Sequence, residues 1–162
     1  FLMAQTVHLK LKIKDNDALG ESTIASLERA DTIECASFEY GVTSPREASG
    51  KQTGRRIHAT VKAVKFVDKT TPLILQALCK NEKCELEFRF FRPEPTGEGD
   101  EQHFYTVVLK NAYVARIRQQ SQDETLGEEK APPMMETIEW VFQDIVWTYF
   151  GGVEAQDSWR GE

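Results

Sequence analysis

Residues 54–92 decide the fold, and they read GRRIHATVKAVKFVDKTTPLILQALCKNEKCELEFRFFR. The pattern predicts a strand, a short helix over about residues 71–81 and a second strand. Thr71 can cap the helix with its hydroxyl, and Pro72 suits the first helical position because the N–H that it lacks has no partner there. An apolar stripe follows, and Asn81 is placed to end the helix. We expect this helix to pack against a β structure rather than to carry chemistry.

Much of the remaining chain alternates between apolar and polar residues, as strands do. In residues 7–14 every second residue is apolar, which predicts one buried face and one exposed face that carries His8, Lys10, Lys12 and Lys14. Residues 57–67 and 136–150 each change the parity of their apolar positions part-way, which indicates a bulge or a bend.

About six such segments, two of them bent, predict a mainly β fold. We expect a small antiparallel β-barrel with one short flanking α-helix, forming a single domain over residues 1–150, and a C-terminal tail over residues 151–162. Residues 43–54, TSPREASGKQTG, have no apolar periodicity and predict a long flexible loop between two strands. A loop of this length is usually functional or ordered by a partner. Gly41, just before it, suggests a bulge or a close backbone approach.

The composition is that of an ordinary globular chain of 162 residues, 40% hydrophobic and 28% charged. No apolar run approaches the roughly 20 residues that span a bilayer, and the start FLMAQTVHLKLKIK has no charged segment followed by an apolar core. We therefore expect no membrane insertion and no secretory signal peptide. Cys35, Cys79 and Cys84 are an odd number without CxxC spacing, which favours free thiols over disulfides or a zinc site.

Motifs of catalysis and cofactor binding are absent from the sequence: it has no GxGxxG, GxxxxGK[ST], GxSxG or HExxH. His8, His58 and His103 are far apart and are expected at the surface or in an interface rather than in catalysis. We expect no catalytic residue, no cofactor, no metal and no enzyme. Nucleic-acid binding by the basic run 51–65 is disfavoured, because the chain is acidic, with a pI near 5.2, and the run has no aromatic residue for stacking.

Charge is unevenly distributed. Residues 51–67 carry five basic side chains and no acid, whereas residues 92–101 and 119–130 are acidic. Such segments are either solvated surfaces or complementary surfaces that meet between subunits.

The order of these features resembles the Hcp family, the haemolysin-coregulated proteins of the type VI secretion system. The resemblance rests on LGES at residues 19–22, SFEYGV at 37–42, YVARIR at 113–118, METIEWVFQDIVWTY at 135–149 and above all KFVDKTTPLILQAL at 65–78. It implies a β-barrel that forms homo-hexameric rings, which stack into an inner tube inside a contractile sheath, with a spike protein at the tip and small effectors in the lumen. It also implies a cytoplasmic stage followed by secretion through the apparatus.

By analogy with the extended loop of that family, residues 43–54 would reach a neighbouring subunit or ring. The residues expected at this interface are Arg46, Lys51, Arg55, Arg56, His58 and Lys62. The alternatives are a monomeric β-barrel that binds a ligand or nucleic acid, and an enzyme whose site is assembled from distant residues.

Overall fold

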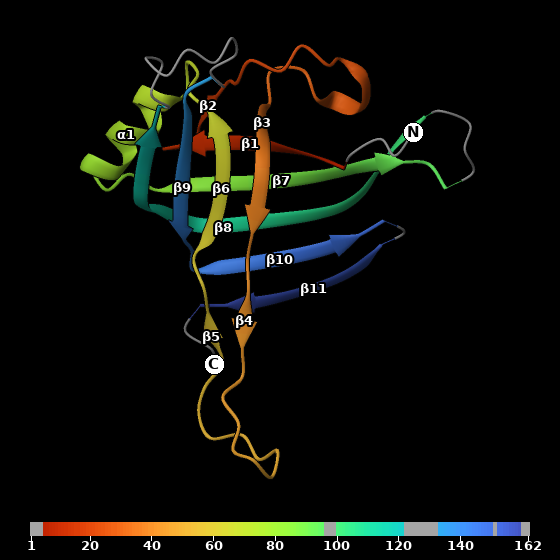
Figure 1. Ribbon diagram of the computed structural model, residues 1–162, viewed down its shortest axis with the longest axis vertical. Helices are drawn as coiled ribbons and strands as arrows, with labels where there is room; N and C mark the ends of the chain where they lie inside the picture. The colour runs from red at the N-terminus through yellow and green to blue at the C-terminus, as the bar shows by residue number, and fades with distance from the viewer. Residues whose placement is uncertain (1–4, 96–99, 122–132, 151, 160–162) are drawn as a thin grey trace, which may run out of the picture.

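The computed structural model describes residues 5–95, 100–121, 133–150 and 152–159. Within them the structure is mainly β, with one α-helix and one short 3-10 helix, as Figure 1 shows. The elements are β1 (Thr6–Ile13), β2 (Asn16–Ala18), the 3-10 helix Ser26–Glu28, β3 (Ile33–Glu39), β4 (Val42–Thr43), β5 (Ile57–His58), β6 (Val61–Phe66), α1 (Thr71–Cys79), β7 (Cys84–Pro93), β8 (Glu101–Gln120), β9 (Met135–Val141), β10 (Asp144–Tyr149) and β11 (Val153–Ser158). The predicted fold class is confirmed.

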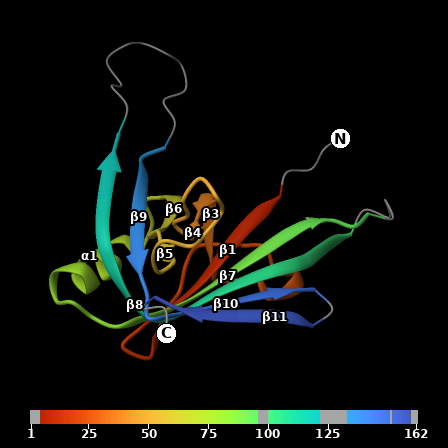
Figure 2. The ribbon, with the colours of Figure 1, turned by 90° about the horizontal axis from the view of Figure 1, so that it is seen from below.

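The main sheet is antiparallel and closes on itself. Its order is β11-β10-β8-β7-β1-β3-β6-β9, and β9 also pairs with β8. Closure depends on the length of β8, whose first half lies beside β7 and β10 and whose second half turns to lie beside β9 (Figure 2). The six strands β8, β7, β1, β3, β6 and β9 therefore form a ring, and β10 and β11 continue the sheet beyond it.

The interior is filled by the apolar positions that alternation predicts. In β1, Leu9 and Leu11 are buried, and Lys10 and Lys12 are exposed. His8 is the exception, because it is fully buried and packs edge-on against Phe91 at 5.4 Å between ring centroids. Its predicted place at the surface is wrong.

The parity change in residues 136–150 is confirmed as a break between strands, because β9 ends at Val141 and β10 begins at Asp144. In residues 57–67 the parity changes at Val64, inside the continuous strand β6, and the pairing with β9 shows no register shift there. The nearby irregularity lies in the partner strand β3, between Cys35 and Ser37. The close backbone approach predicted at Gly41 is wrong, because a Cβ built there meets nothing within 4 Å. The crowded glycine is Gly20, where a Cβ would lie 2.3 Å from the carbonyl oxygen of Thr32.

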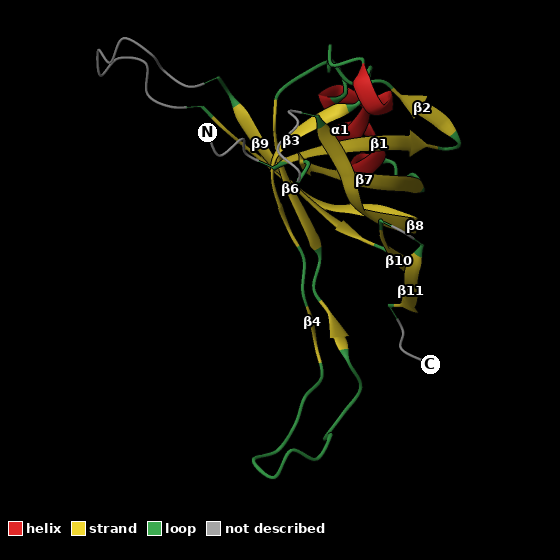
Figure 3. Cartoon of the chain, turned by 90° about the vertical axis from the view of Figure 1, so that its right-hand side faces the viewer, coloured by secondary structure: helices red, strands yellow, loops and turns green. Residues whose placement is uncertain are grey.

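The predicted loop over residues 43–54 has more structure than expected. β4 and β5 pair at its base, and the bridge between Arg46 and Gln52 continues the ladder outward. Together, residues 42–58 form a hairpin that projects from the barrel (Figures 1 and 3). The segment expected as a C-terminal tail contains β11, which pairs along its whole length with β10.

Helix α1 spans Thr71–Cys79, close to the predicted residues 71–81, and its end agrees with the prediction, but its first turn is not capped as predicted. Asn81 follows it with φ of 50°, the left-handed conformation typical of the position after a helix. The N-cap is Thr70, whose side chain makes no capping hydrogen bond. The Thr71 hydroxyl instead donates to the Glu136 carboxylate at 2.8 Å, so its predicted capping role is wrong.

Thr71 belongs to a buried ionic network centred on Lys65. The Lys65 ammonium contacts Glu136 at 2.5 Å, Asp68 at 2.9 Å and the Thr71 hydroxyl at 3.2 Å. The side chains of Lys65 and Glu136 are each 1% exposed. Gln119 of β8 donates to the second oxygen of Glu136 at 3.0 Å. The network therefore joins β6, β8, β9 and α1.

No helix in the described part of the chain is long and apolar enough to cross a membrane.

Removing the charge of Glu136 should destabilise the fold. Glu136→Gln leaves Lys65 buried with Asp68 as its remaining carboxylate, and losing one partner of a buried ion pair costs about 3–5 kcal/mol. We expect about 3 kcal/mol of lost unfolding free energy in urea titrations. The matched control is Glu139→Gln on the same strand, which lies 3.8 Å from an exposed Arg116 and should cost less than about 1 kcal/mol. Equal effects of the two variants would contradict the importance of the network.

Acid should weaken the fold through His8. Thr32 donates its hydroxyl to the carbonyl of Arg29, so Nδ1 of His8, 2.9 Å from that hydroxyl oxygen, carries the proton. Nε2 is buried and makes no hydrogen bond within the described residues. Burial lowers the pKa of His8 below its ordinary 6.5, because a proton on Nε2 would be a buried charge.

The unfolded chain therefore takes up this proton at higher pH than the folded one, and stability falls as the pH drops below about 6.5. His8→Phe should make the unfolding free energy depend less steeply on pH between about 7 and 5. Urea titrations at several pH values measure the slope, and an unchanged slope would show that His8 does not contribute.

Candidate assembly surfaces

The projecting hairpin, residues 42–58, carries three of the six residues predicted at an interface in exposed positions. Arg46, Lys51 and Arg55 are all exposed. Backbone hydrogen bonds brace the hairpin from within, such as Thr53 N–H to the Pro45 carbonyl at 2.9 Å. Arg46 adds a bond to the carbonyl of Gly50 at 2.9 Å. A braced hairpin can present these cations in a defined arrangement.

The base of the hairpin is fixed to the C-terminal strand by a polar cluster that we call the Asp157 clasp: Arg56, His58, Asp157 and Tyr40. Arg56 donates to both carboxylate oxygens of Asp157, and His58 Nε2 lies 2.8 Å from one of them. Tyr40 lies 2.6 Å from the other ring nitrogen of His58. The hydrogen bond from Arg56 lowers the pKa of Asp157 to about 2. The carboxylate is therefore charged near neutral pH and holds the hairpin in place.

The order Tyr40–His58–Asp157 resembles a nucleophile, a base and an orienting acid. However, burial raises the pKa of Tyr40 to about 12, so its phenol stays protonated. The clasp is better explained as a structural connection.

Trp159 completes this connection. Its ring stacks on His58 at 6.1 Å and meets Phe142 edge-on at 5.0 Å. The backbone N–H of Trp159 donates to the Gln143 carbonyl at 2.7 Å. In the sequence, the signal for this contact was that Trp159 is an aromatic residue in the mostly polar segment 151–162.

The other predicted interface residues lie apart from the exposed cations. Arg56 and His58 are in the clasp, and Lys62 is half-buried in β6 opposite Glu139 of β9. Lys65, the last cation of the basic segment, is buried in the core. Residues 51–67 are therefore not one continuous basic surface, because alternation along β6 turns Lys65 inward.

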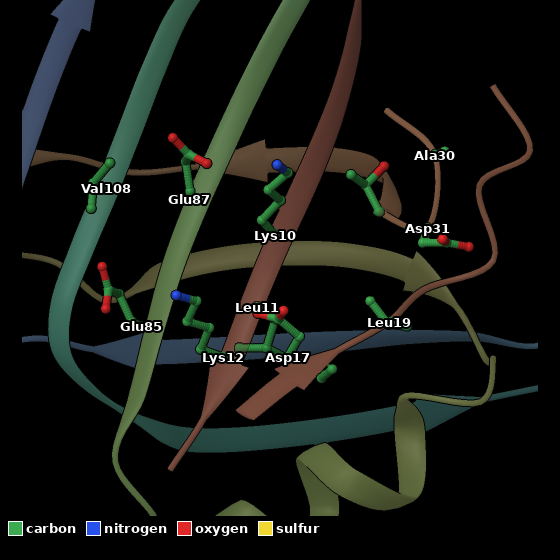
Figure 4. Close-up of a pocket in the computed structure, with 12 residues that line it drawn as sticks. Lys10, Leu11, Lys12, Asp17, Leu19, Ala30, Asp31, Glu85, Glu87 and Val108 are labelled. Atoms are coloured by element: carbon green, nitrogen blue, oxygen red, sulfur yellow. The ribbon is translucent and has the colours of Figure 1, made fainter. Parts of the chain in front are cut away.

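A second surface is a groove of about 540 Å³, which sequence reasoning missed. β1 and β7 form its floor, and β2 with residues 19–32 form its wall (Figure 4). Cross-strand register places Lys10 opposite Glu87 and Lys12 opposite both Glu85 and Asp17. Leu19, 51% exposed, lies in the wall. Its parts are distant in sequence, so only the folded sheet brings them together.

Potential metal ligands are not gathered into a cluster in the described residues. No group of three or more His, Cys, Asp and Glu side chains there could hold a metal ion. Cys35, Cys79 and Cys84 are free, and burial raises the pKa of Cys35 and Cys84 to about 12. His103 lies 2.7 Å from the Thr106 hydroxyl.

Comparison with known proteins gives consistent matches. The model of the family described as "Type VI secretion system effector, Hcp" matches residues 9–149. The "Major exported protein" of Pseudomonas aeruginosa is 29% identical over 133 residues, which cover 80% of this chain and 76% of that protein. A variant of Hcp1 from E. coli EAEC 042 is 25% identical, with a TM-score of 0.81 over 96% of this chain and 99% of the other. A crystal structure described as Hcp protein, 24% identical, shares the fold with a TM-score of 0.83 over 98% and 100% of the two chains.

Opening the clasp should free the hairpin. Asp157→Asn removes the charge that Arg56 and His58 bind, so the base of the hairpin should separate from β11 more often. We expect trypsin to cut at Arg46, Lys51 and Arg55 several times faster than in the unchanged protein. Glu154→Gln, on the same strand but outside the clasp, is the control and should leave the cleavage rate unchanged. Equal rates in all three proteins would show that the clasp does not restrain the hairpin.

Proposed function

The chain belongs to the Hcp family of the type VI secretion system, and on that basis we propose that it is a structural subunit of the tube that this system expels. Six copies form a ring, and the rings stack into the tube. A contractile sheath surrounds the tube, a spike protein caps it, and small effectors travel in the lumen. The subunit itself acts without catalysis or a cofactor.

The observation that carries this proposal is the hairpin. Residues 42–58 add little to the barrel core, yet they are braced by their own hydrogen bonds and fixed at the base by Asp157. A projecting element of this kind is suited to reach another copy. A closed ring uses a heterologous interface, in which one patch of each subunit meets a different patch of the next. We assign Arg46, Lys51 and Arg55 to the contacting part and Arg56 and His58 to its support, with Lys62 at the edge of the same interface.

Export from the cell follows from the same assignment. The related P. aeruginosa protein is named for being exported, and the matching family is described as an effector of the type VI secretion system. We infer that the chain is held in the cytoplasm until firing and then leaves through the apparatus.

The first test is the assembly state of the purified protein. Native mass spectrometry should give a mass of about six subunits, and negative-stain images should show rings and short stacks. A monomer at every concentration tested would contradict the proposal and favour a ligand-binding barrel.

A deletion tests the hairpin. Removing residues 48–53 takes away the tip but leaves β4, β5 and the clasp. We expect an unchanged unfolding temperature, with single rings or monomers in place of stacks. A control that replaces the same residues with glycine and serine keeps the length and removes Lys51. If both variants form the same tubes as the unchanged protein, the tip of the hairpin is not needed for assembly.

A further inference from the structure

The groove and the hairpin carry unlike charge. The groove is lined by the carboxylates of Asp17, Asp31, Glu85 and Glu87 against the two ammonium groups of Lys10 and Lys12. In the hairpin segment 44–56, by contrast, Arg46, Lys51, Arg55 and Arg56 stand against the one acid Glu47.

The charged groups of the groove are open to solvent. Asp17, Asp31 and Glu85 are exposed, and these three carboxylates make no salt bridge within 4.0 Å to any residue that the structure describes. Glu87 is half-buried and bonded to Arg89 at 2.9 Å. Asp17, Asp31 and Glu85 can therefore receive cations from outside.

The two surfaces lie at opposite ends of the molecule. Residues 19–32, the wall of the groove, are at the upper end of Figure 1, and the tip of the hairpin is at the lower end of the longest axis. One chain therefore cannot place its own hairpin in its own groove. Contact between the two surfaces requires a second copy.

We propose that the groove is the receptor for the hairpin of a neighbouring copy of this chain. The exposed cations of the hairpin meet the carboxylates of the groove, and Pro45 and Ala48 lie against the exposed Leu19. This inference rests on the proposed tube function and names the surface that the hairpin contacts.

The shapes are compatible. At about 540 Å³ the groove has the volume of a pocket that takes several side chains, not a folded domain. The tip is narrow, because Glu47 N–H bonds to the Lys51 carbonyl and Gly50, with φ of 88°, turns the chain within the loop between them. The contact is heterologous, as a ring or a stack requires.

The test reverses the charges on each side separately. The hairpin variant is Lys51→Glu with Arg55→Glu, and the groove variant is Glu85→Lys with Glu87→Lys. Each alone brings like charges together at the changed positions and should weaken assembly at least about tenfold, as expected for the loss of close charge pairs across an interface.

Mixing the two variants distinguishes a direct contact from a general effect. The acidic hairpin of one variant then faces the basic groove of the other, and the basic hairpin of the second faces the acidic groove of the first. An equimolar mixture should assemble with alternating subunits. Native mass spectrometry measures the ring and negative-stain imaging the stack. If the mixture assembles, both variants are folded. This check matters because the new lysines of the groove variant lie opposite Lys12 and Lys10 across the strands.

The matched control is Glu34→Lys with Glu154→Lys, which makes the same change of charge on exposed positions of β3 and β11, outside the groove. It should assemble alone and should not rescue the hairpin variant. The inference is overturned if the groove variant assembles like the unchanged protein, or if the mixture fails although each variant is folded by circular dichroism. In either case the tube function stands as long as the unchanged protein forms rings. An unchanged protein that stays monomeric would contradict both.

Discussion

The structure depends most on the burial of Lys65. Register pairs it directly with Glu136 across β6 and β9, and both side chains are removed from water. Burying a charge without a partner is strongly unfavourable, so this position tolerates the lysine only because several acceptors converge on it. Glu136, Asp68, Thr71 and the Phe66 carbonyl all do so.

Each partner comes from a different part of the fold, and this gives the network its structural importance. Glu136 is on β9, Thr71 is in the first turn of α1, and Asp68 is in the turn between β6 and the helix. Through Gln119 the network also reaches the half of β8 that closes the barrel. A slip of one residue between β6 and β9 would separate Lys65 from Glu136 and turn both side chains to the other face. The network therefore specifies barrel register and helix position together.

The sequence predicted what local pattern determines. Alternation located the strands, the parity change in residues 136–150 located the break between β9 and β10, and the positive φ of Asn81 agrees with its predicted place at the helix end. It failed where a tertiary partner overrode the local signal. Thr71 has the chemistry of a cap, but a buried carboxylate 65 residues away takes its hydroxyl. His8 and Lys65 occupy polar positions in sequence and are buried because Thr32 and Glu136 provide partners.

The candidate surfaces show the same division. The exposed cations of the hairpin could be predicted, because no apolar periodicity holds residues 43–54 in the core. The clasp could not be predicted from the sequence, because Asp157 lies about a hundred residues from Arg56 and contacts it only after β11 joins the sheet. The groove could not either, since its charges alternate within single strands and become a cluster only by cross-strand register.

The clasp and the exposed charges contribute different properties to the proposed assembly. A free loop of this length would lose conformational entropy on docking, whereas a hairpin held by Asp157 is already ordered and loses less. The cations and carboxylates that meet between copies are exposed, so each pair is screened by salt and individually weak. Rigid placement then fixes the geometry of the contact, and the strength comes from repeating it around and along the assembly. A tube built in this way depends on many ordered, weak contacts. A substitution that opens the clasp should therefore disturb assembly as much as the loss of a charge in the contact itself.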